Sequence, residues 1–172
     1  MKLLCKCWRI KVDSIKLFLV DCDGVLTDGG MYYFESGDEA KKFNTRDGMA
    51  FKLLKLKNIK IGIITGEKTN IVLNRAKKLK MDFVFMGVEN KLKVVDKLIN
   101  DLGISYENVL YIGDDINDLE VIKKVGFSAC PGDAEKIVKD NCSYISDVFG
   151  GHGVVRDIYN KFFESFDGEI NE

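Results

Sequence analysis

The stretch LFLVDCDGVLTD at residues 17–28 decides how the rest of this sequence is interpreted. Its first four residues are all apolar and a turn follows, a pattern typical of a strand buried in a parallel sheet. Asp21 and Asp23 come directly after this run, and Gly24 permits a sharp turn. Because side chains alternate along a strand, we expect both carboxylates on one side, about 6–7 Å apart. Open α/β sheets bind ligands at this carboxyl end of their strands.

Two neighbouring carboxylates repel each other unless a cation or a shared proton lies between them. A hard divalent cation with oxygen ligands, Mg²⁺ by preference, resolves the conflict. A calcium loop is excluded, because Val25 and Leu26 stand where such a loop needs Asp or Asn and Gly. The alternative is a metal-free strand end followed by an Asp-rich turn, and the Asp-x-Asp pattern alone leaves both interpretations open.

Length and composition restrict the class of protein. The 172 residues suit one compact domain, and 46% hydrophobic residues exclude a disordered chain. With 26 basic and 27 acidic residues there is no positive excess for binding nucleic acid. No apolar run is long enough to span a membrane. The five scattered cysteines predict reduced thiols, so we expect a cytoplasmic protein without a zinc site.

Strands and helices alternate along the chain. Further strands are predicted at 59–64, 83–86, 109–112, 127–129 and 144–145, and helices at 47–56, 69–80, 90–102, 117–124, 134–139 and 154–166. This alternation predicts an α/β, Rossmann-like fold with a mainly parallel sheet flanked by helices. We expect one domain over residues 15–166, an N-terminal arm at 1–14 and a C-terminal tail at 167–172.

A β-hairpin insertion is predicted at residues 31–44, where aromatic side chains flank a polar turn. A two-stranded hairpin is too small to bury these side chains alone. We therefore expect it to contact another protein chain, although it could instead fold back on its own domain. The side chains expected to be exposed are Tyr32, Tyr33, Phe34 and Phe43.

Three more polar clusters follow predicted strands or open predicted helices. The pair TG at 65–66 offers a hydroxyl and backbone N–H groups to a phosphate. Lys91 begins a helix, and its cation could neutralise a phosphoryl oxygen. The stretch GDDIND at 113–118 adds carboxylates after another strand. Each cluster alone is more simply a helix cap or a solvated side chain, but together they lie in the order that a single site requires.

The four clusters together resemble the motifs of the haloacid dehalogenase superfamily of phosphotransferases, over residues 16 to about 160. The resemblance implies that Asp21 attacks phosphorus and forms an aspartyl-phosphate, while Asp23 protonates the leaving oxygen and then activates water. An Asp at position 23 favours a phosphatase over a dehalogenase. The resemblance also implies Mg²⁺ held by Asp21, the backbone carbonyl of Asp23 and Asp114, with Asp115 and Asp118 nearby, and a phosphoryl group bound by Thr65, Gly66 and Lys91.

The stretch between the first two motifs holds only the hairpin and one helix, so no cap domain is expected. The sequence is similar to the capless branch that hydrolyses 3-deoxy-octulosonate 8-phosphate or its nine-carbon relatives. The match is carried by LTDG at 26–29, the aromatic hairpin, NTRDG at 44–48 and GGHGVVR at 150–156. It implies a homotetramer in which the hairpins pack together and neighbouring subunits cover each site.

Glu67 departs from the eight-carbon pattern, in which Arg usually follows the second-motif Gly. With Arg75 and Lys78 it resembles the branch that acts on 2-keto-3-deoxynononate 9-phosphate or sialic acid 9-phosphate. Arg75 and Lys78 share a helical face and could bind the sugar-acid carboxylate, while Glu67 could accept hydrogen bonds from hydroxyls. The alternative is that Arg75 and Lys78 form a solvated face. We favour the nine-carbon substrate.

Other functions are compatible with parts of the sequence. A phosphatase that acts on 3-deoxy-octulosonate 8-phosphate, a sugar acid related to lipopolysaccharide, would use the same chemistry. A mutase is disfavoured, because without a cap it could not exclude water during transfer. A non-catalytic partner of a nucleotide-sugar synthetase is opposed by the intact motifs. His152 is the only histidine, and we expect its Gly-rich loop to close over substrate or a neighbouring subunit rather than His152 to act in catalysis.

Overall fold

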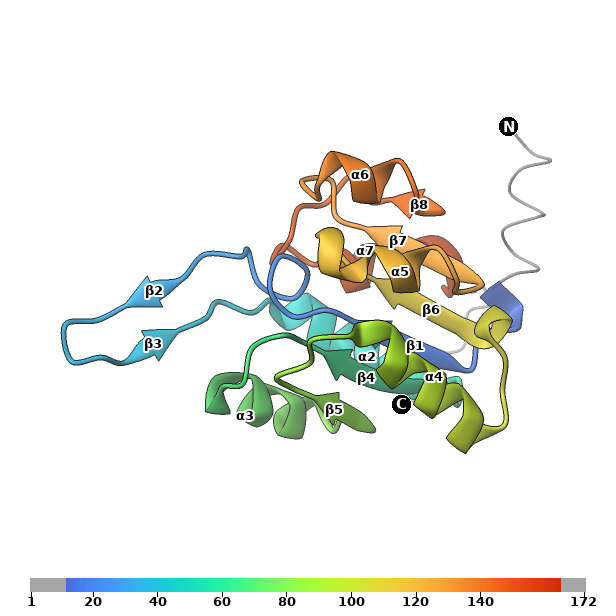
Figure 1. The fold of residues 1–172 in the computed structure, drawn as a ribbon, viewed down its shortest axis with the longest axis horizontal. Coiled ribbons are helices and arrows are strands. Elements are labelled where there is room, and N and C mark those ends of the chain that lie inside the picture. The colour runs from blue at the N-terminus through green and yellow to red at the C-terminus, as the bar shows by residue number, and fades with distance from the viewer. Residues whose placement is uncertain (1–11, 165–172) are drawn as a thin grey trace.

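A six-stranded parallel sheet forms the centre of the computed structural model, which describes residues 12–164 (Figure 1). Its order is β5-β4-β1-β6-β7-β8, and every neighbouring pair is parallel. The strands are β1 (Leu17–Val20), β4 (Lys60–Ile64), β5 (Phe83–Phe85), β6 (Val109–Ile112), β7 (Phe127–Cys130) and β8 (Tyr144–Ile145). The predicted α/β class is confirmed. Most of the predicted arm at 1–14 and all of the tail at 167–172 lie outside the described residues.

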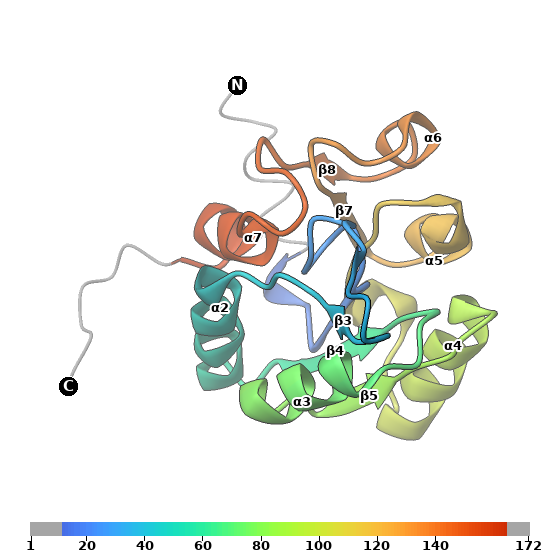
Figure 2. The ribbon, with the colours of Figure 1, turned by 90° about the vertical axis from the view of Figure 1, so that its left-hand side faces the viewer.

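The helices cover both faces of the sheet (Figure 2). Because all four residues of β1 are buried and alternate, they enter two separate cores. The helices are α2 (Thr45–Leu56), α3 (Asn70–Leu79), α4 (Lys91–Leu102), α5 (Leu119–Ile122), α6 (Lys136–Lys139) and α7 (Val154–Phe162). Phe18 and Val20 pack with α2, α3 and α7, whereas Leu17 and Leu19 pack with α4, α5 and α6. None of the helices within residues 12–164 is long and apolar enough to cross a membrane.

The helix boundaries follow from capping residues that the sequence already displays. The side chains of Asn44, Thr69 and Asn90 accept hydrogen bonds from backbone N–H groups in the first turns of α2, α3 and α4. The helix predicted at 117–124 is divided, because a 3-10 turn, η2 (Ile116–Asp118), precedes α5. A second 3-10 turn, η1 (Tyr106–Asn108), leads into β6.

The aromatic hairpin projects away from the body of the domain (Figure 1). Its paired strands, β2 (Tyr32–Tyr33) and β3 (Glu39–Ala40), are shorter than the predicted stretch. Tyr33 is 66% exposed and Phe34 56%, as the sequence predicts. The expectation that Phe43 is exposed is wrong: the chain has returned to the domain after β3, and Phe43 packs, partly buried, against the core.

The Gly-rich segment at 150–153 packs against the loop that follows β1. The Gly151 N–H donates to the Val25 carbonyl at 3.0 Å. At Gly150 a Cβ would lie only 2.1 Å from the Gly24 carbonyl oxygen, so only glycine permits this approach. His152 is exposed, with Nδ1 2.7 Å from the Gly150 carbonyl. The segment therefore supports the loop of its own subunit.

Asp47 joins α2 to the beginning of α7. The side chain is buried, and its Oδ1 accepts a hydrogen bond from the backbone N–H of Arg156 at 3.1 Å. Burial raises the pKa of Asp47 from 3.8 to about 6, although the Arg156 N–H favours the charged form. The folded state thus binds this proton more tightly than the unfolded chain does. The resulting stabilisation is present below about pH 4 and is lost as the pH rises through 6.

Asp47→Asn should remove this pH dependence, because the amide oxygen still accepts from Arg156 but never ionises. Between pH 4 and pH 7 the wild type should lose about 2 kcal/mol of unfolding free energy relative to Asp47→Asn. Urea denaturation at several pH values measures this difference. Asp47→Ala, which also lacks the acceptor, should be less stable than Asp47→Asn by about 1 kcal/mol at every pH. Parallel pH profiles of wild type and Asp47→Asn would contradict the assignment.

Candidate active site

A buried lysine lies between two aspartates at the carboxyl edge of the sheet. Lys91, the first residue of α4, places its Nζ 2.9 Å from Asp21 Oδ2 and 2.7 Å from Asp118 Oδ1. All three side chains are buried. Burial acts to lower the pKa of Lys91, but the two carboxylates outweigh it and raise that pKa. The strands β1 and β6 are adjacent in the sheet, which brings these distant parts of the sequence together.

Asp118 organises the loop after β6. Its Oδ1 also accepts from the Tyr111 hydroxyl at 2.5 Å, and its Oδ2 accepts from the backbone N–H groups of Asp114 at 3.0 Å and Asp115 at 3.4 Å. Both oxygens are therefore occupied within the protein. Asp115 itself is exposed, and its side chain accepts from the Ile116 N–H at 2.6 Å. Asp118 thus positions Lys91 and the loop carboxylates.

The carboxylates at this edge fit a divalent cation. Oxygens of Asp21, Asp114 and Asp118 all lie within 4.8 Å of one another. Burial, with the neighbouring carboxylates, raises the pKa of Asp21 to about 7 and that of Asp114 to about 8. Asp114 Oδ1 is buried without a hydrogen-bond partner among residues 12–164. Asp118 already has four partners, whereas Asp21 has two, the Cys22 N–H on Oδ1 at 2.7 Å and Lys91 on Oδ2. Asp21 and Asp114 therefore keep lone pairs that a cation could bind, and oxygen donors suit Mg²⁺.

The Asp23 carboxylate has none of the partners that bind Asp21 and Asp118. β1 ends at Val20, and the Asp21 N–H still donates to the Ile112 carbonyl of β6 at 2.9 Å. Asp23 Oδ1 accepts from the Lys41 ammonium at 2.6 Å and from the Thr27 hydroxyl at 3.1 Å. Its Oδ2 is buried with no hydrogen-bond partner in the described part of the chain. Sequence reasoning missed Lys41, because nothing in the sequence distinguishes it from the adjacent Lys42.

Thr65 lies at the same edge, since it follows β4 and β4 pairs with β1. The side chain is buried, and its hydroxyl oxygen accepts from the Glu67 N–H at 3.2 Å. The Thr65 hydroxyl therefore remains available to donate a hydrogen bond to a ligand. The helix α3 begins only at Asn70, so its N-terminus does not start at Gly66.

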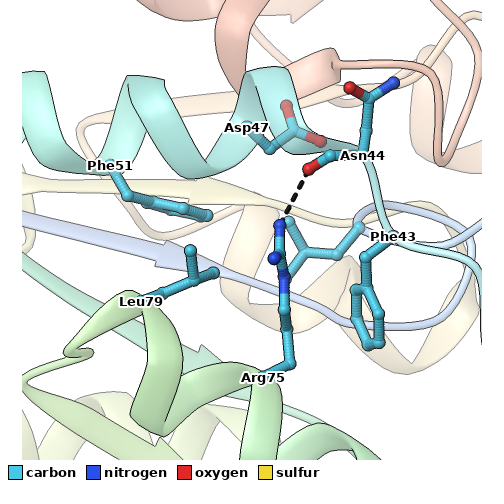
Figure 3. A pocket seen from close by; sticks show the side chains of 7 residues that line it. Phe43, Asn44, Asp47, Phe51, Arg75 and Leu79 are labelled. Carbon is cyan, nitrogen blue, oxygen red and sulfur yellow. Dashed lines mark hydrogen bonds between the residues drawn. The ribbon is translucent and has the colours of Figure 1, made fainter.

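The three residues predicted to determine substrate specificity lie in three different environments. Glu67 Oε2 lies 2.7 Å from the Lys41 Nζ, next to the partner of Asp23. Arg75 donates to the Asn44 carbonyl at 2.8 Å, and its guanidinium carbon lies 5.4 Å from the centre of the Phe43 ring (Figure 3). Lys78 is exposed, with no ion-pair partner within residues 12–164. The structure brings only Glu67 to the side chains around Asp23.

Comparisons with known proteins agree with this geometry. A sequence model of haloacid dehalogenase-like hydrolases matches residues 87–158. The 3-deoxy-D-manno-octulosonate 8-phosphate phosphatase of Salmonella typhi is 38% identical over 148 residues, 86% of this chain and 79% of the relative. The chain therefore belongs to the haloacid dehalogenase superfamily and is one of its phosphatases.

Solved structures give the same result. The phosphatase of that name from Moraxella catarrhalis, in complex with a magnesium ion, a phosphate ion and a KDO molecule, superimposes with a TM-score of 0.88. It is 33% identical, over 92% of this chain and 93% of that one. The enzyme from Yersinia pestis gives a TM-score of 0.86 at 34% identity, covering 88% and 82% of the two chains. The predicted phosphatase class is confirmed.

Gly24→Ala should weaken Mg²⁺ binding by displacing Asp114. Gly24 has φ +81°, and a Cβ there would lie 1.9 Å from Asp114 Oδ2. Isothermal titration calorimetry should show a Kd for Mg²⁺ raised by about 10–100-fold. Gly37→Ala is the matched control, because Gly37 has φ +86° but nothing within 4 Å of the added carbon. Equal effects of both substitutions would assign the loss to backbone strain instead.

Proposed function

We propose that this protein is a Mg²⁺-dependent phosphomonoesterase that hydrolyses a phosphorylated α-keto sugar acid through an aspartyl-phosphate. The observation that carries the proposal is the arrangement of the buried Asp21 and Lys91 with the partly buried Asp114, next to Asp23. Mg²⁺ bound by Asp21, Asp114 and the Asp23 backbone carbonyl would supply positive charge against the carboxylates and the phosphoryl oxygens. The named substrate and the bound magnesium of the relatives support this class of substrate and metal.

The side chains divide the reaction between them. Asp21 Oδ forms a bond to phosphorus while the bond to the leaving oxygen breaks. Asp23 gives the leaving oxygen its proton through Oδ2, the oxygen that has no partner in the protein. Asp23 then accepts a proton from the water that attacks the phosphoryl group and releases Asp21. Lys91 and the Thr65 hydroxyl donate to the phosphoryl oxygens during both steps.

Glu67 favours a nine-carbon substrate, 2-keto-3-deoxynononate 9-phosphate or sialic acid 9-phosphate. Its carboxylate is fixed by Lys41 yet 40% exposed, so it can accept hydrogen bonds from sugar hydroxyls next to Asp23. Arg75 is occupied by the Asn44 carbonyl and would have to leave it to bind a substrate carboxylate, whereas the exposed Lys78 has no ion-pair partner among residues 12–164. The second candidate is the eight-carbon 8-phosphate, which the names of the relatives favour.

Phosphate release with Mg²⁺ decides between these substrates. The wild type should show a kcat/KM at least about tenfold higher for the nine-carbon substrate, or about 1.4 kcal/mol in transition-state binding. Glu67→Arg should reverse this preference, because it replaces an acceptor by a donor. Glu120→Arg is the control, an equal charge change on an exposed residue of α5. An unchanged preference in Glu67→Arg would contradict the role of Glu67, and a wild-type preference for the eight-carbon substrate would favour the second candidate.

We also propose that the aromatic hairpin assembles a homotetramer. Tyr32, Tyr33 and Phe34 expose apolar surface at a projecting element, which favours contact with another chain. Replacing Tyr33 and Phe34 by Ser should convert the tetramer to smaller species in sedimentation velocity. Leu56→Ser, at a residue of α2 that is 72% exposed, is the control and should leave the assembly intact. A tetramer that survives the hairpin substitutions would contradict the proposal.

A further inference from the structure

Lys41 is a buried cation at the base of the hairpin that no motif assigns. It directly follows β3, and only 1% of its side chain is exposed. Its Nζ lies 2.6 Å from Asp23 Oδ1 and 2.7 Å from Glu67 Oε2. The neighbouring Lys42, by contrast, has a side chain that is 55% exposed and pairs with Asp28 at 3.1 Å. Two adjacent lysines thus have opposite environments.

The position of Lys41 is poorly explained by stability alone. Removing an ammonium from water costs free energy that an ion pair often fails to recover, so a buried ion pair is weak evidence of stabilisation. The position does solve an electrostatic problem, because one cation separates two carboxylates that would otherwise repel each other. Lys41 therefore permits Glu67 to lie beside Asp23.

Lys41 and Thr27 also determine which oxygen of Asp23 is paired. The ammonium and the Thr27 hydroxyl both bind Oδ1, which restricts rotation of the carboxyl group. The other oxygen, Oδ2, is buried and has no partner among the described residues. A general acid must be held within hydrogen-bond reach of the atom that it protonates.

We propose that Lys41 is a positioning residue: it holds Asp23 so that Oδ2 transfers the proton, and it links this carboxylate to Glu67. The proposal rests on the role of Asp23 in the proposed phosphatase reaction, but not on the identity of the sugar acid. Lys41 is expected to matter most when the leaving oxygen needs a proton.

The test compares two aryl phosphates that need no sugar recognition. p-Nitrophenolate leaves without a proton, whereas the more basic phenolate gains from protonation. Lys41→Met keeps the length of the side chain and removes the ammonium. It should lower kcat/KM for phenyl phosphate about tenfold more than kcat/KM for p-nitrophenyl phosphate. The value of kcat/KM reports only the steps up to and including the first irreversible one. Hydrolysis of the aspartyl-phosphate comes later and therefore does not affect it.

Four further variants test whether the loss acts through Asp23. Asp23→Asn should show the same dependence on the leaving group, and adding Lys41→Met to it should cost little more, because both substitutions remove one function. Lys42→Met is the matched control and should behave as the wild type. Lys41→Arg retains the charge and replaces Lys41→Met as the test if Lys41→Met is unstable. We expect Lys41→Arg to lose less kcat/KM than Lys41→Met, with the same dependence on the leaving group.

An equal loss with both aryl phosphates, or no loss with either, would overturn the positioning role. Additive losses in the double variant would also overturn it. A wild type that hydrolyses both aryl phosphates but neither sugar-acid phosphate would instead contradict the proposed substrate. The two failures are therefore distinguishable.

Discussion

The buried ammonium of Lys91 between Asp21 and Asp118 is the interaction on which the arrangement of the site depends. It connects the end of β1 with the first turn of α4 and the loop after β6. A charged side chain with 1% exposure is tolerated only because carboxylates meet it on both sides. The parallel sheet supplies this geometry, since the carboxyl ends of adjacent strands lie at one edge.

Two lysines divide the carboxylates of the site into two groups with different charge. Around Lys91, three aspartates share one cation, and burial together with the excess negative charge raises the pKa of Asp21 and of Asp114. That excess is what makes this group suitable for a divalent cation. Around Lys41, two carboxylates share one cation. The first group suits metal and phosphate chemistry, and the second suits proton transfer and contact with the substrate.

The alternating strands and helices, and the order of the four polar clusters, could be predicted from the sequence, because buried strands and amphipathic helices have local patterns. The fold class and the phosphatase class were both confirmed. Predictions of side-chain environment were less successful. Phe43 carries the same aromatic signal as its exposed neighbours, yet it packs against the core and under Arg75. Lys41 and Arg75 are ordinary charged residues in the sequence, and only their three-dimensional neighbours distinguish them.

The sequence by itself determined the parallel sheet, the placement of carboxylates after β1 and β6, and the family. These properties depend on short-range patterns and on residue types that recur at strand ends. Only the tertiary structure decided that Asp118 is fully occupied, that Asp23 turns to Lys41, and that Arg75 turns to the Asn44 carbonyl. The physical reason is that these partners are distant from one another in the sequence, so local patterns cannot choose among the charged and polar groups available. Which partner it takes depends on burial and on the other charges that the fold brings near it.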